Sequence, residues 1–394
     1  MDDMTPEFKV GTYDLHGDAN FNFQLNRMLM YGGGDLEEVK EAAKKITDMA
    51  SWVSTFIDYG ERALREGRVR QAIAYFRGAE FFMYGDVREK HRVYERATEL
   101  FYEHYSHIFE EGTVVGDRVP YQHGYLPVWI TRPGESAGTI LMHGGYDSSK
   151  EEFLGTVLYL KEKGYTVYFF EGPGQGEVLK RCGIPFTHEW ERPVKAVLDH
   201  YGLDEVTIVG ISLGGMLAPR AAAFEPRIKR VVAWGVLPNF LDVVLSTRPR
   251  ALRYLTKMFL RLGLKPLINA AAKHQMAADS LAEWGIKHGC YAFGVDSPYD
   301  FLRMADKFQF LDVADSITQD FLLLGSTRDH FIPLDFYKAV IDRLSNVRSL
   351  TFRLFTEREC AENHCNVGNI RLALDTISTW IAGMSRHVGA CSAS

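Results

Sequence analysis

The first clear pattern along the chain is helical and extends from about residue 36 to residue 110. Three stretches, DLEEVKEAAKKITDMASWVSTFIDYGERALREG, RVRQAIAYFRGAEFFMYG and DVREKHRVYERATELFYEHYSHIF, place apolar residues three and four positions apart. This spacing gives each helix one apolar face, and the glycines between the stretches are typical of helix ends. No repeat of about 34 residues recurs, which argues against a helical array. The pattern predicts a helical N-terminal region over residues 1–111.

From residue 112 the chain changes to short apolar runs. The segment TVVGDRVPYQHGYLPVWITRPG, rich in Val, Tyr, Trp and Thr and broken by Gly and Pro, predicts two antiparallel strands. Apolar runs then alternate with amphipathic segments, which predicts strands at 138–145, 165–174, 205–212 and 228–237 and helices at 148–164, 188–202 and 214–226. Such alternation is typical of a parallel sheet that has helices on both faces.

The alternation lapses over residues 238–305, where helical segments follow one another without a convincing strand. It resumes with a strand in DFLLLGSTRDHFIP, the helix LDFYKAVIDRL, the strand SLTFRLF and a last helix, VGNIRLALDTISTWIAGMSRH. A helical block between two strands usually lies over the edge of the sheet. We therefore expect an α/β core formed by residues 112–237 and 306–394, with a helical lid insertion at 238–305.

A serine lies between glycines in GISLGG, residues 210–215, where one predicted strand ends and the next helix begins. In Gly-x-Ser-x-Gly the serine occupies a tight, strained turn, and small neighbours are needed because a β-carbon would collide with the adjoining backbone. The turn exposes the hydroxyl at the carboxyl end of the sheet. An ordinary glycine-rich turn is the alternative, but the flanking strand and helix favour Ser212 as a nucleophile.

A serine hydroxyl is a poor nucleophile until a neighbouring base takes its proton. On this type of fold the partners follow in the order serine, acid, histidine. Asp329 follows the strand FLLLGSTR, and His364 lies between the strand SLTFRLF and the last helix. Both residues fit that order, so we expect Asp329 and His364 to complete a catalytic triad with Ser212.

Four other histidines compete with His364 for the role of the base. His330 adjoins Asp329, but neighbours in a loop point apart. His274 and His288 lie in the predicted lid, where a place on the surface is favoured over a place in a pocket. His143, in MHGGYDSS, fits a structural role that holds a loop.

Three other carboxylates compete with Asp329 or add to it. Asp315 and Asp320 precede their strand and are expected at the wrong end of the sheet. Asp242 follows another strand and is a candidate for a second carboxylate in the pocket.

The glycine-containing stretch HGGYDSSKEE, residues 143–152, can supply backbone hydrogen-bond donors to such a site. Attack on a carbonyl creates an oxyanion, which requires preorganised hydrogen-bond donors. We expect one donor to be the backbone N–H of Leu213 and the other that of Tyr146 or Gly145. Ser148 also resembles a helix N-cap, with Glu151 three residues later, and the two uses are compatible.

Composition narrows the class of protein. The formal net charge of −6 argues against a general nucleic-acid binder, which usually carries a basic face. The chain has no apolar run near the roughly 18 residues that a membrane span needs, and its first residues lack the features of a secretory signal. Five cysteines among 394 residues are unlike a disulfide framework, so we expect a cytoplasmic protein with reduced thiols.

Two further motifs imply no cofactor. The stretch EGPGQGE, residues 171–177, lacks both glycine patterns of phosphate-binding loops and is interpreted as a tight turn near the mouth of the pocket. Cys360, His364 and Cys365 have no fourth ligand or Cys-x₂-Cys pair beside them, so zinc is not expected.

These motifs resemble the α/β-hydrolase superfamily from about residue 112 to residue 385, through GISLGG, HGGYDSS, TRDHFIP and ENHC. GGYDSSKEE, EGPGQGE and GISLGG behind a helical region are similar to a narrower group, 2,6-dihydroxypseudooxynicotine hydrolase and the fungal polyketide-shortening hydrolases, with FrsA-like esterases more distant. The resemblance implies a cofactor-free serine hydrolase that cleaves a carbon–carbon bond next to a ketone in an aromatic or polyketide-like small molecule. Neither a nucleic acid nor a membrane is expected as a partner.

The same residues leave three alternatives open. A carboxylesterase uses the same triad, and an acyltransferase or cyclase differs only in what intercepts the acyl-enzyme. A binding protein that has kept the fold is the third alternative. The helices at 36–110 either cover the pocket, form the interface of a homodimer, or do both.

Overall fold

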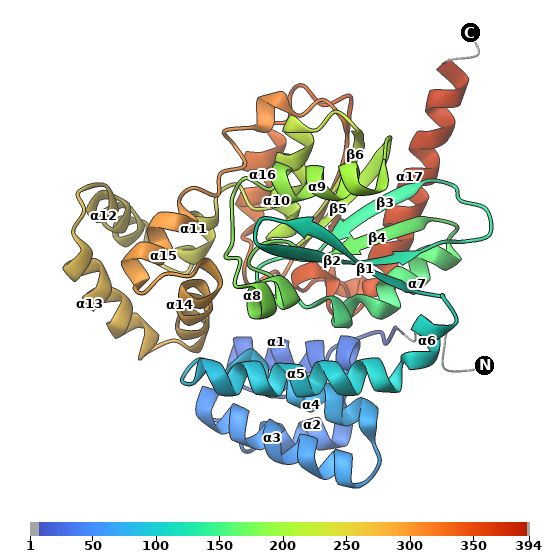
Figure 1. The fold of residues 1–394 in the computed structure, drawn as a ribbon. Coiled ribbons are helices and arrows are strands. Elements are labelled where there is room, and N and C mark those ends of the chain that lie inside the picture. Colours follow the sequence, from blue (N-terminus) through green and yellow to red (C-terminus); the bar gives the residue numbers. More distant parts are fainter. Residues whose placement is uncertain (1–7, 392–394) are drawn as a thin grey trace.

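The centre of the molecule is a sheet of eight strands in the order β1-β2-β4-β3-β5-β6-β7-β8 (Figure 1) within residues 8–391, which the computed structural model describes. The strands are β1 (Val115–Tyr121), β2 (Gly124–Thr131), β3 (Thr139–His143), β4 (Thr166–Phe170), β5 (Val206–Ile211), β6 (Ile228–Trp234), β7 (Asp320–Ser326) and β8 (Ser349–Phe355). β2 pairs antiparallel with both β1 and β4, and the remaining neighbours are parallel. The predicted α/β fold with a mostly parallel sheet is confirmed.

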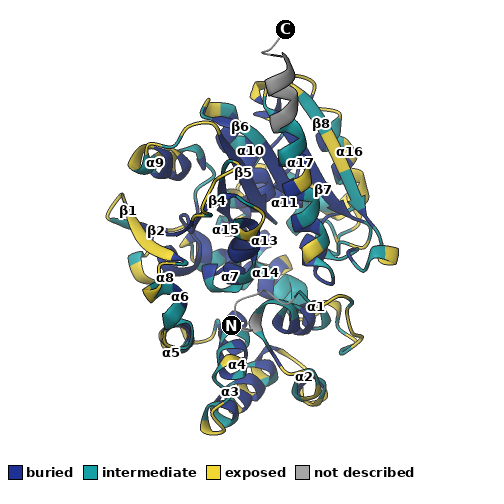
Figure 2. Ribbon diagram, turned by 90° about the vertical axis from the view of Figure 1, so that its right-hand side faces the viewer, coloured by how far each residue is buried: buried dark blue, intermediate teal, exposed yellow. Residues whose placement is uncertain are grey.

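Helices cover both faces of the sheet, so the middle strands are buried along most of their length (Figure 2). One face packs against α8 (Gly176–Cys182), α9 (Glu191–Tyr201), α10 (Gly214–Phe224) and α16 (Leu334–Ile341), and the other against α7 (Leu154–Glu162) and α17 (Ile370–Cys391). Side chains alternate between the two cores along each strand, as Ile208 and Val209 do in β5. The continuous apolar runs of the sequence reflect this double burial.

The N-terminal helices form a layer at one end of the sheet, next to its carboxyl-terminal loops (Figure 1). They are α1 (Ala19–Arg27), the π-helical turn η1 (Met28–Gly32), α2 (Leu36–Ala43), α3 (Met49–Arg65), α4 (Val69–Phe81), α5 (Val87–His104) and α6 (Ser106–Glu110). The helical pattern from residue 36 misses α1. Its N-cap Asp18 accepts hydrogen bonds from the N–H groups of Asn20 and Phe21, and Phe21 stacks on Trp52 of α3.

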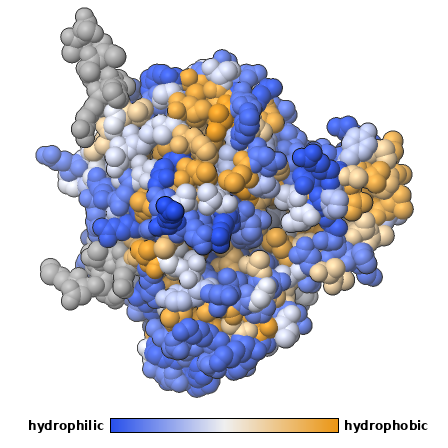
Figure 3. All heavy atoms as spheres, turned by 180° about the vertical axis from the view of Figure 1, so that it is seen from behind, coloured by the Kyte–Doolittle hydropathy of each residue, from blue (hydrophilic) through white to orange (hydrophobic). Residues whose placement is uncertain are grey.

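Five further helices, here called the lid helices, connect β6 to β7 and lie beside the sheet (Figure 1). They are α11 (Phe240–Val244), α12 (Arg250–Arg261), α13 (Lys265–Met276), α14 (Ser280–Phe293) and α15 (Pro298–Ala305). Exposed apolar side chains gather on α12, on α13 and between them, seen at the right of Figure 3; they include Leu252, Tyr254, Leu255, Leu262 and Leu267. In the described part of the chain, no helix is long and apolar enough to cross a membrane.

Half-buried ion pairs join the N-terminal helices to the loop after β3. The Arg27 guanidinium lies 2.7 Å from Asp147 and 2.6 Å from Glu152, and Arg77 lies 3.1 Å from Glu152. Burial alone would raise the pKa of Asp147, but the attraction of Arg27 outweighs it and lowers that pKa below its ordinary value. The position of α1 against this loop therefore depends on charge pairing as well as on apolar contact.

Replacing Arg27 by glutamine tests this connection. Arg27→Gln leaves the half-buried Asp147 without its cation and Glu152 with Arg77 alone, so the free energy of unfolding should fall by about 1–3 kcal/mol in urea titrations. Lys163→Gln is the control, because Lys163 pairs with Asp375 at 2.7 Å where both side chains are more than a third exposed. That change should cost less than about 1 kcal/mol. Equal losses in the two variants would contradict the structural role of Arg27.

Candidate active site

Ser212 occupies the sharp turn between β5 and α10. Its φ is +60°, a left-handed conformation that is uncommon for a residue with a side chain, and its N–H donates to the carbonyl of Trp234 at 2.8 Å. Small neighbours make the turn possible. A β-carbon at Gly210 would lie 1.9 Å from the carbonyl oxygen of Gly214, and one at Gly214 would lie 2.6 Å from that of Gly144. The turn sets the Ser212 hydroxyl at the carboxyl end of the sheet.

The structure brings Ser212, His364 and Asp329 into one hydrogen-bonded chain. The Nε2 atom of His364 lies 2.7 Å from Oγ of Ser212, and its Nδ1 atom lies 2.7 Å from a carboxylate oxygen of Asp329. A carboxylate only accepts, so Nδ1–H donates to Asp329 and Nε2 is left to accept from the serine hydroxyl. Asp329 lies between β7 and α16, and His364 begins the short turn η5 (His364–Asn366).

Burial and pairing set the charges of this chain. The side chains of His364 and Asp329 are 8% and 1% exposed. Burial lowers the pKa of His364, but the combined attraction of Asp329 and the neighbouring Cys365 raises it well above its ordinary value of 6.5. Burial raises the pKa of Asp329, yet His364 and the N–H of Phe331 lower it below its ordinary value. The arrangement therefore favours an ionised Asp329 that stabilises a positive charge on His364.

The four histidines that compete with His364 for the role of the base each have different surroundings. His143 donates from Nδ1 to the carbonyl of Gly144 at 3.0 Å and accepts from Trp190, which is a structural arrangement. His288 is buried rather than on the surface: its Nε2 bonds the carbonyl of Tyr146 at 2.8 Å. His274 is exposed and lines the cavity described below.

His330 also lines the cavity, but the structure shows no hydrogen bond between it and Ser212. Burial lowers its pKa to about 4, so its imidazole is neutral near pH 7. Its ring packs on Phe331 with centroids 3.9 Å apart, and this contact fixes it beside the site.

The competing carboxylates lie away from Ser212. Asp320, at the amino end of β7, pairs with Arg348, and Asp315 lies 3.4 Å from Arg343. Asp242 does not line the cavity: in α11 its carboxylate turns to Lys257, 2.5 Å away on α12. The carboxylates that do line the cavity are Asp147, Glu152 and Asp279. Distance along the chain from Ser212 could not reveal which way the short helix α11 points its side chains.

Two backbone N–H groups remain unpaired beside Ser212. Leu213 begins the turn into α10, and its N–H has no hydrogen-bond partner among residues 8–391; the same holds for Tyr146. The N–H of Gly145 is engaged, because it donates to Oγ of Ser148 at 2.7 Å. Of the two residues predicted for the loop donor, Tyr146 therefore has the free group. Ser148 holds this loop and makes no cap for η2 (Lys150–Phe153), whose N-cap is Ser149.

Sequence analysis missed the residue that fixes the carbonyls of this loop. The side-chain amide of Gln175 donates to the carbonyls of Gly144 and Gly145, both at 2.9 Å, and its oxygen accepts from the N–H of Gly172. Gln175 lies in EGPGQGE, interpreted from the sequence as a tight turn near the mouth of the pocket. The polar residue among its glycines was the available signal.

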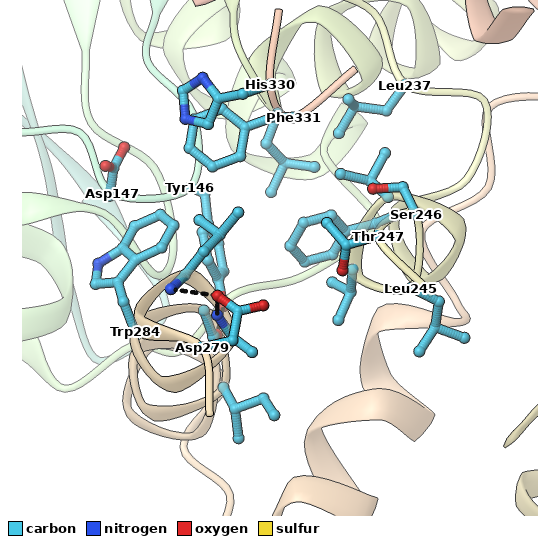
Figure 4. A pocket seen from close by; sticks show the side chains of 18 of the residues that line it. Tyr146, Asp147, Leu237, Leu245, Ser246, Thr247, Asp279, Trp284, His330 and Phe331 are labelled. Carbon is cyan, nitrogen blue, oxygen red and sulfur yellow. Dashed lines mark hydrogen bonds between the residues drawn. The ribbon is translucent and has the colours of Figure 1, made fainter. Parts of the chain in front are cut away.

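A cavity of about 450 Å³ opens over Ser212. Its walls come from α1, from the loop after β3, from the loop that contains His330 and Phe331, and mostly from the lid helices. Figure 4 shows Tyr146, Asp147 and Trp284 on one side of this space and Leu245, Ser246 and Thr247 on the other. The lining is largely aliphatic and aromatic, so the cavity can hold an apolar small molecule against the serine.

Metal-ligand chemistry finds no support around Cys360, His364 and Cys365. Across the described residues, no three His, Cys, Asp or Glu side chains gather closely enough to hold a metal ion. His364 uses both ring nitrogens in the hydrogen-bonded chain.

Comparison with known sequences identifies relatives among fungal hydrolases. The model of the alpha/beta hydrolase family matches residues 139–357, more than half of the chain. Alpha/beta hydrolase psoB of Aspergillus fumigatus is 34% identical over 259 residues, which are 54% of this chain and 57% of psoB. Hydrolyase poxO of Penicillium oxalicum is 30% identical over 73% of this chain and 77% of its own length. The 20-hydroxy-prefusarin hydrolase FUS2 of Gibberella moniliformis is 28% identical over 72% of this chain and 76% of its own length.

Solved structures share the fold along most of the chain. The crystal structure of 2,6-dihydroxy-pseudo-oxynicotine hydrolase superposes with a TM-score of 0.61 at 21% identity, covering 91% of this chain and 94% of that one. AbyA5 superposes with a TM-score of 0.66 at 17% identity, covering 91% and 93%. At these identities the likeness is one of fold, and it includes the helical N-terminal region.

A methyl group at Gly145 tests the contact between the loop and the serine turn. Its β-carbon would lie 2.7 Å from the carbonyl oxygen of Ile211 and 2.9 Å from the backbone nitrogen of Leu213. Gly145→Ala should therefore displace the loop and lower the free energy of unfolding by about 1–3 kcal/mol in urea titrations. Gly134→Ala is the control: nothing lies within 4 Å of its β-carbon, and it should change stability by less than about 0.5 kcal/mol. Unchanged stability in Gly145→Ala would contradict the tight contact.

Proposed function

The chain belongs to the alpha/beta hydrolase family, as its motifs predict, and from this premise we propose that it is a serine hydrolase that cleaves a carbon–carbon bond next to a ketone. Ser212 is the nucleophile, His364 the general base and acid, and Asp329 the carboxylate that orients the imidazole. One observation carries the proposal: the 2.7 Å contact between Nε2 of His364 and Oγ of Ser212 at the floor of an apolar cavity. The distance suits a direct proton transfer.

In the first step Ser212 Oγ attacks the ketone carbon of the substrate while His364 Nε2 takes the hydroxyl proton. The ketone oxygen becomes an oxyanion and accepts hydrogen bonds from the N–H groups of Leu213 and Tyr146. Removing one such donor typically costs about 2.7–4 kcal/mol of transition-state stabilisation. Asp329 stays ionised and stabilises the imidazolium, which is consistent with the raised pKa of His364.

In the second step the tetrahedral intermediate collapses and its carbon–carbon bond breaks. The bond electrons leave with the carbon that a second carbonyl activates, so the leaving group is an enolate, and the His364 imidazolium protonates it. The acyl group stays on Ser212 as an ester. His364 then takes a proton from water, the hydroxide adds to this ester, and a carboxylic acid leaves as Ser212 regains its proton.

The substrate is proposed to be a polyketide-like or aromatic small molecule. Support comes from the apolar lining of the cavity, and from the resemblance of the motifs to hydrolases that shorten polyketides. FUS2 is named for its action on 20-hydroxy-prefusarin, and the similar solved structure for its action on 2,6-dihydroxy-pseudo-oxynicotine. The homodimer and the cytoplasmic location derived from the sequence stay predictions.

Hydrolysis of an aryl β-diketone in ¹⁸O-labelled water tests the reaction. The carboxylic acid product should carry one solvent oxygen, because water must release the acyl-enzyme. Ser212→Ala should lower kcat at least about a thousandfold. The exposed Ser54→Ala on α3 should have no effect. A Ser212→Ala enzyme that keeps full turnover would refute the nucleophile. An ester or a cyclised product in place of the labelled acid would indicate acyl transfer instead of hydrolysis.

The pH profile tests the base. His364 accepts a proton only when it is neutral, so kcat/KM should fall as the pH falls through its pKa, which lies above 6.5. Asp329→Asn removes the carboxylate that raises this pKa. The acid limb should then move to lower pH, while kcat above the limb falls by about 10⁴. The exposed Asp335→Asn, at the start of α16, is the control and should change neither quantity. An acid limb that stays in place in Asp329→Asn would contradict the coupling.

A further inference from the structure

Most charged groups that line the cavity already have partners. Arg27 forms ion pairs with Asp147 and Glu152. The carboxylate of Asp279 caps α14 by accepting from the N–H groups of Leu281 and Ala282. Groups with such partners gain little from a ligand.

A stretch of three consecutive residues after α11 differs from this pattern. Ser246, Thr247 and Arg248 all line the cavity. Among residues 8–391, the Ser246 and Thr247 hydroxyls have no hydrogen-bond partner, and the Arg248 guanidinium has neither a hydrogen bond nor an ion pair within 4.0 Å. Figure 4 shows Ser246 and Thr247 across the cavity from Tyr146 and Trp284. Three neighbouring side chains, two hydroxyls and one guanidinium, thus line one region of the wall without a partner in the described part of the chain.

The positive charge of Arg248 is poorly compensated. Burial lowers the pKa of its guanidinium, and the Asp279 carboxylate offsets this effect only in part. Asp279 also accepts from the amide of Gln275 at 3.1 Å, in addition to the N–H groups at the start of α14. An arginine stays protonated in a protein, so a partly buried guanidinium without a counterion favours an anion.

We propose that Ser246, Thr247 and Arg248 bind a carboxylate at the end of the substrate remote from the bond that Ser212 attacks. The proposal rests on the function proposed above and narrows its substrate class to apolar acids. Arg248 supplies paired N–H donors and the charge, and the two hydroxyls reach the remaining lone pairs of the carboxylate. A bound acid would thereby supply the counterion that Arg248 lacks.

The wall between the two ends fits an apolar connecting segment. Val243, Val244, Leu252 and Phe259 line the same cavity as Ser212, His364 and the polar stretch. A substrate that satisfies both ends has a carbonyl for Ser212, a hydrocarbon or aromatic middle, and an ionised acid at the far end. The acid would fix which carbonyl of a polyketide-like chain reaches the serine.

Binding to the Ser212→Ala protein tests the subsite without catalysis. The probes are decanoate and decanamide, which share a hydrocarbon chain and differ in charge, and the measurement is isothermal titration calorimetry. Decanoate should bind at least about tenfold more tightly, the gain expected from charge-assisted hydrogen bonds. In the double variant that carries both Ser212→Ala and Arg248→Gln, this preference should vanish. With Arg250→Gln it should persist, because Arg250 is exposed and lies outside the cavity lining.

Hydrolysis gives a second readout with Ser212 intact. The mono-p-nitrophenyl ester of sebacic acid and p-nitrophenyl decanoate have chains of equal length, and only the first carries a remote carboxylate. Its kcat/KM should be at least about tenfold higher than that of p-nitrophenyl decanoate. This advantage should disappear in Arg248→Gln and be partly restored in Arg248→Lys. The ratio of the two esters within each variant is unaffected by a general loss of folded enzyme.

The outcomes separate the two proposals. Equal binding of decanoate and decanamide, or a preference that survives Arg248→Gln, would overturn the carboxylate subsite even if both esters are hydrolysed. A charge preference that depends on Arg248, found in a protein whose Ser212 hydrolyses neither ester, would keep the subsite and refute the proposed hydrolase.

Discussion

The close contact between two backbone turns, one after β3 and one after β5, is the constraint on which the site depends. A β-carbon at Gly145 would overlap the backbone of Ile211 and Leu213, and one at Gly214 would overlap the carbonyl of Gly144. Because side chains are absent there, the free N–H groups of Tyr146 and Leu213 lie in the two adjoining turns beside the serine hydroxyl. The left-handed φ of Ser212 is one cost of this arrangement, and a backbone strained in this way persists only where the surroundings hold it.

Polar side chains hold the turn after β3 in place. Gln175 and His143 both donate to the carbonyl of Gly144, and Arg27 draws Asp147 toward α1. Buried ion pairs add little net stability compared with apolar packing, but breaking one leaves an uncompensated charge. The pairing therefore specifies the position of the N-terminal helices more than it strengthens the fold. On this view the helical layer is part of the site, since it fixes the loop that carries a proposed oxyanion donor.

Local patterns in the sequence predicted the strands, the serine turn and the order of Ser212, Asp329 and His364, because each rests on residues adjacent along the chain or on the order of elements. Predictions that needed side-chain direction did less well. Asp242 turns to Lys257, His288 is buried under Tyr146, and the N–H of Gly145 bonds Ser148. Such directions are decided by partners far along the chain, as with Arg27 and Asp147, 120 residues apart, and no periodicity encodes them. The helix α1 was missed for a related reason: its apolar face is short and is completed by packing on α3.

Chemistry and selectivity are divided between different parts of this molecule. The serine, imidazole and carboxylate are fixed by the sheet and by loops at its carboxyl end, and they would serve a ketone and an ester alike. The lid helices supply most of the cavity wall, and their exposed apolar residues Leu252, Leu255 and Leu267 line it directly. Apolar walls discriminate weakly between substrates, since one methylene is worth only about 1–3 kcal/mol, whereas an unpaired buried donor rejects ligands that cannot satisfy it far more strongly. The half-buried Arg248 and Ser246, which have no partner in the described part of the chain, are therefore where the lid can add selectivity to its apolar wall.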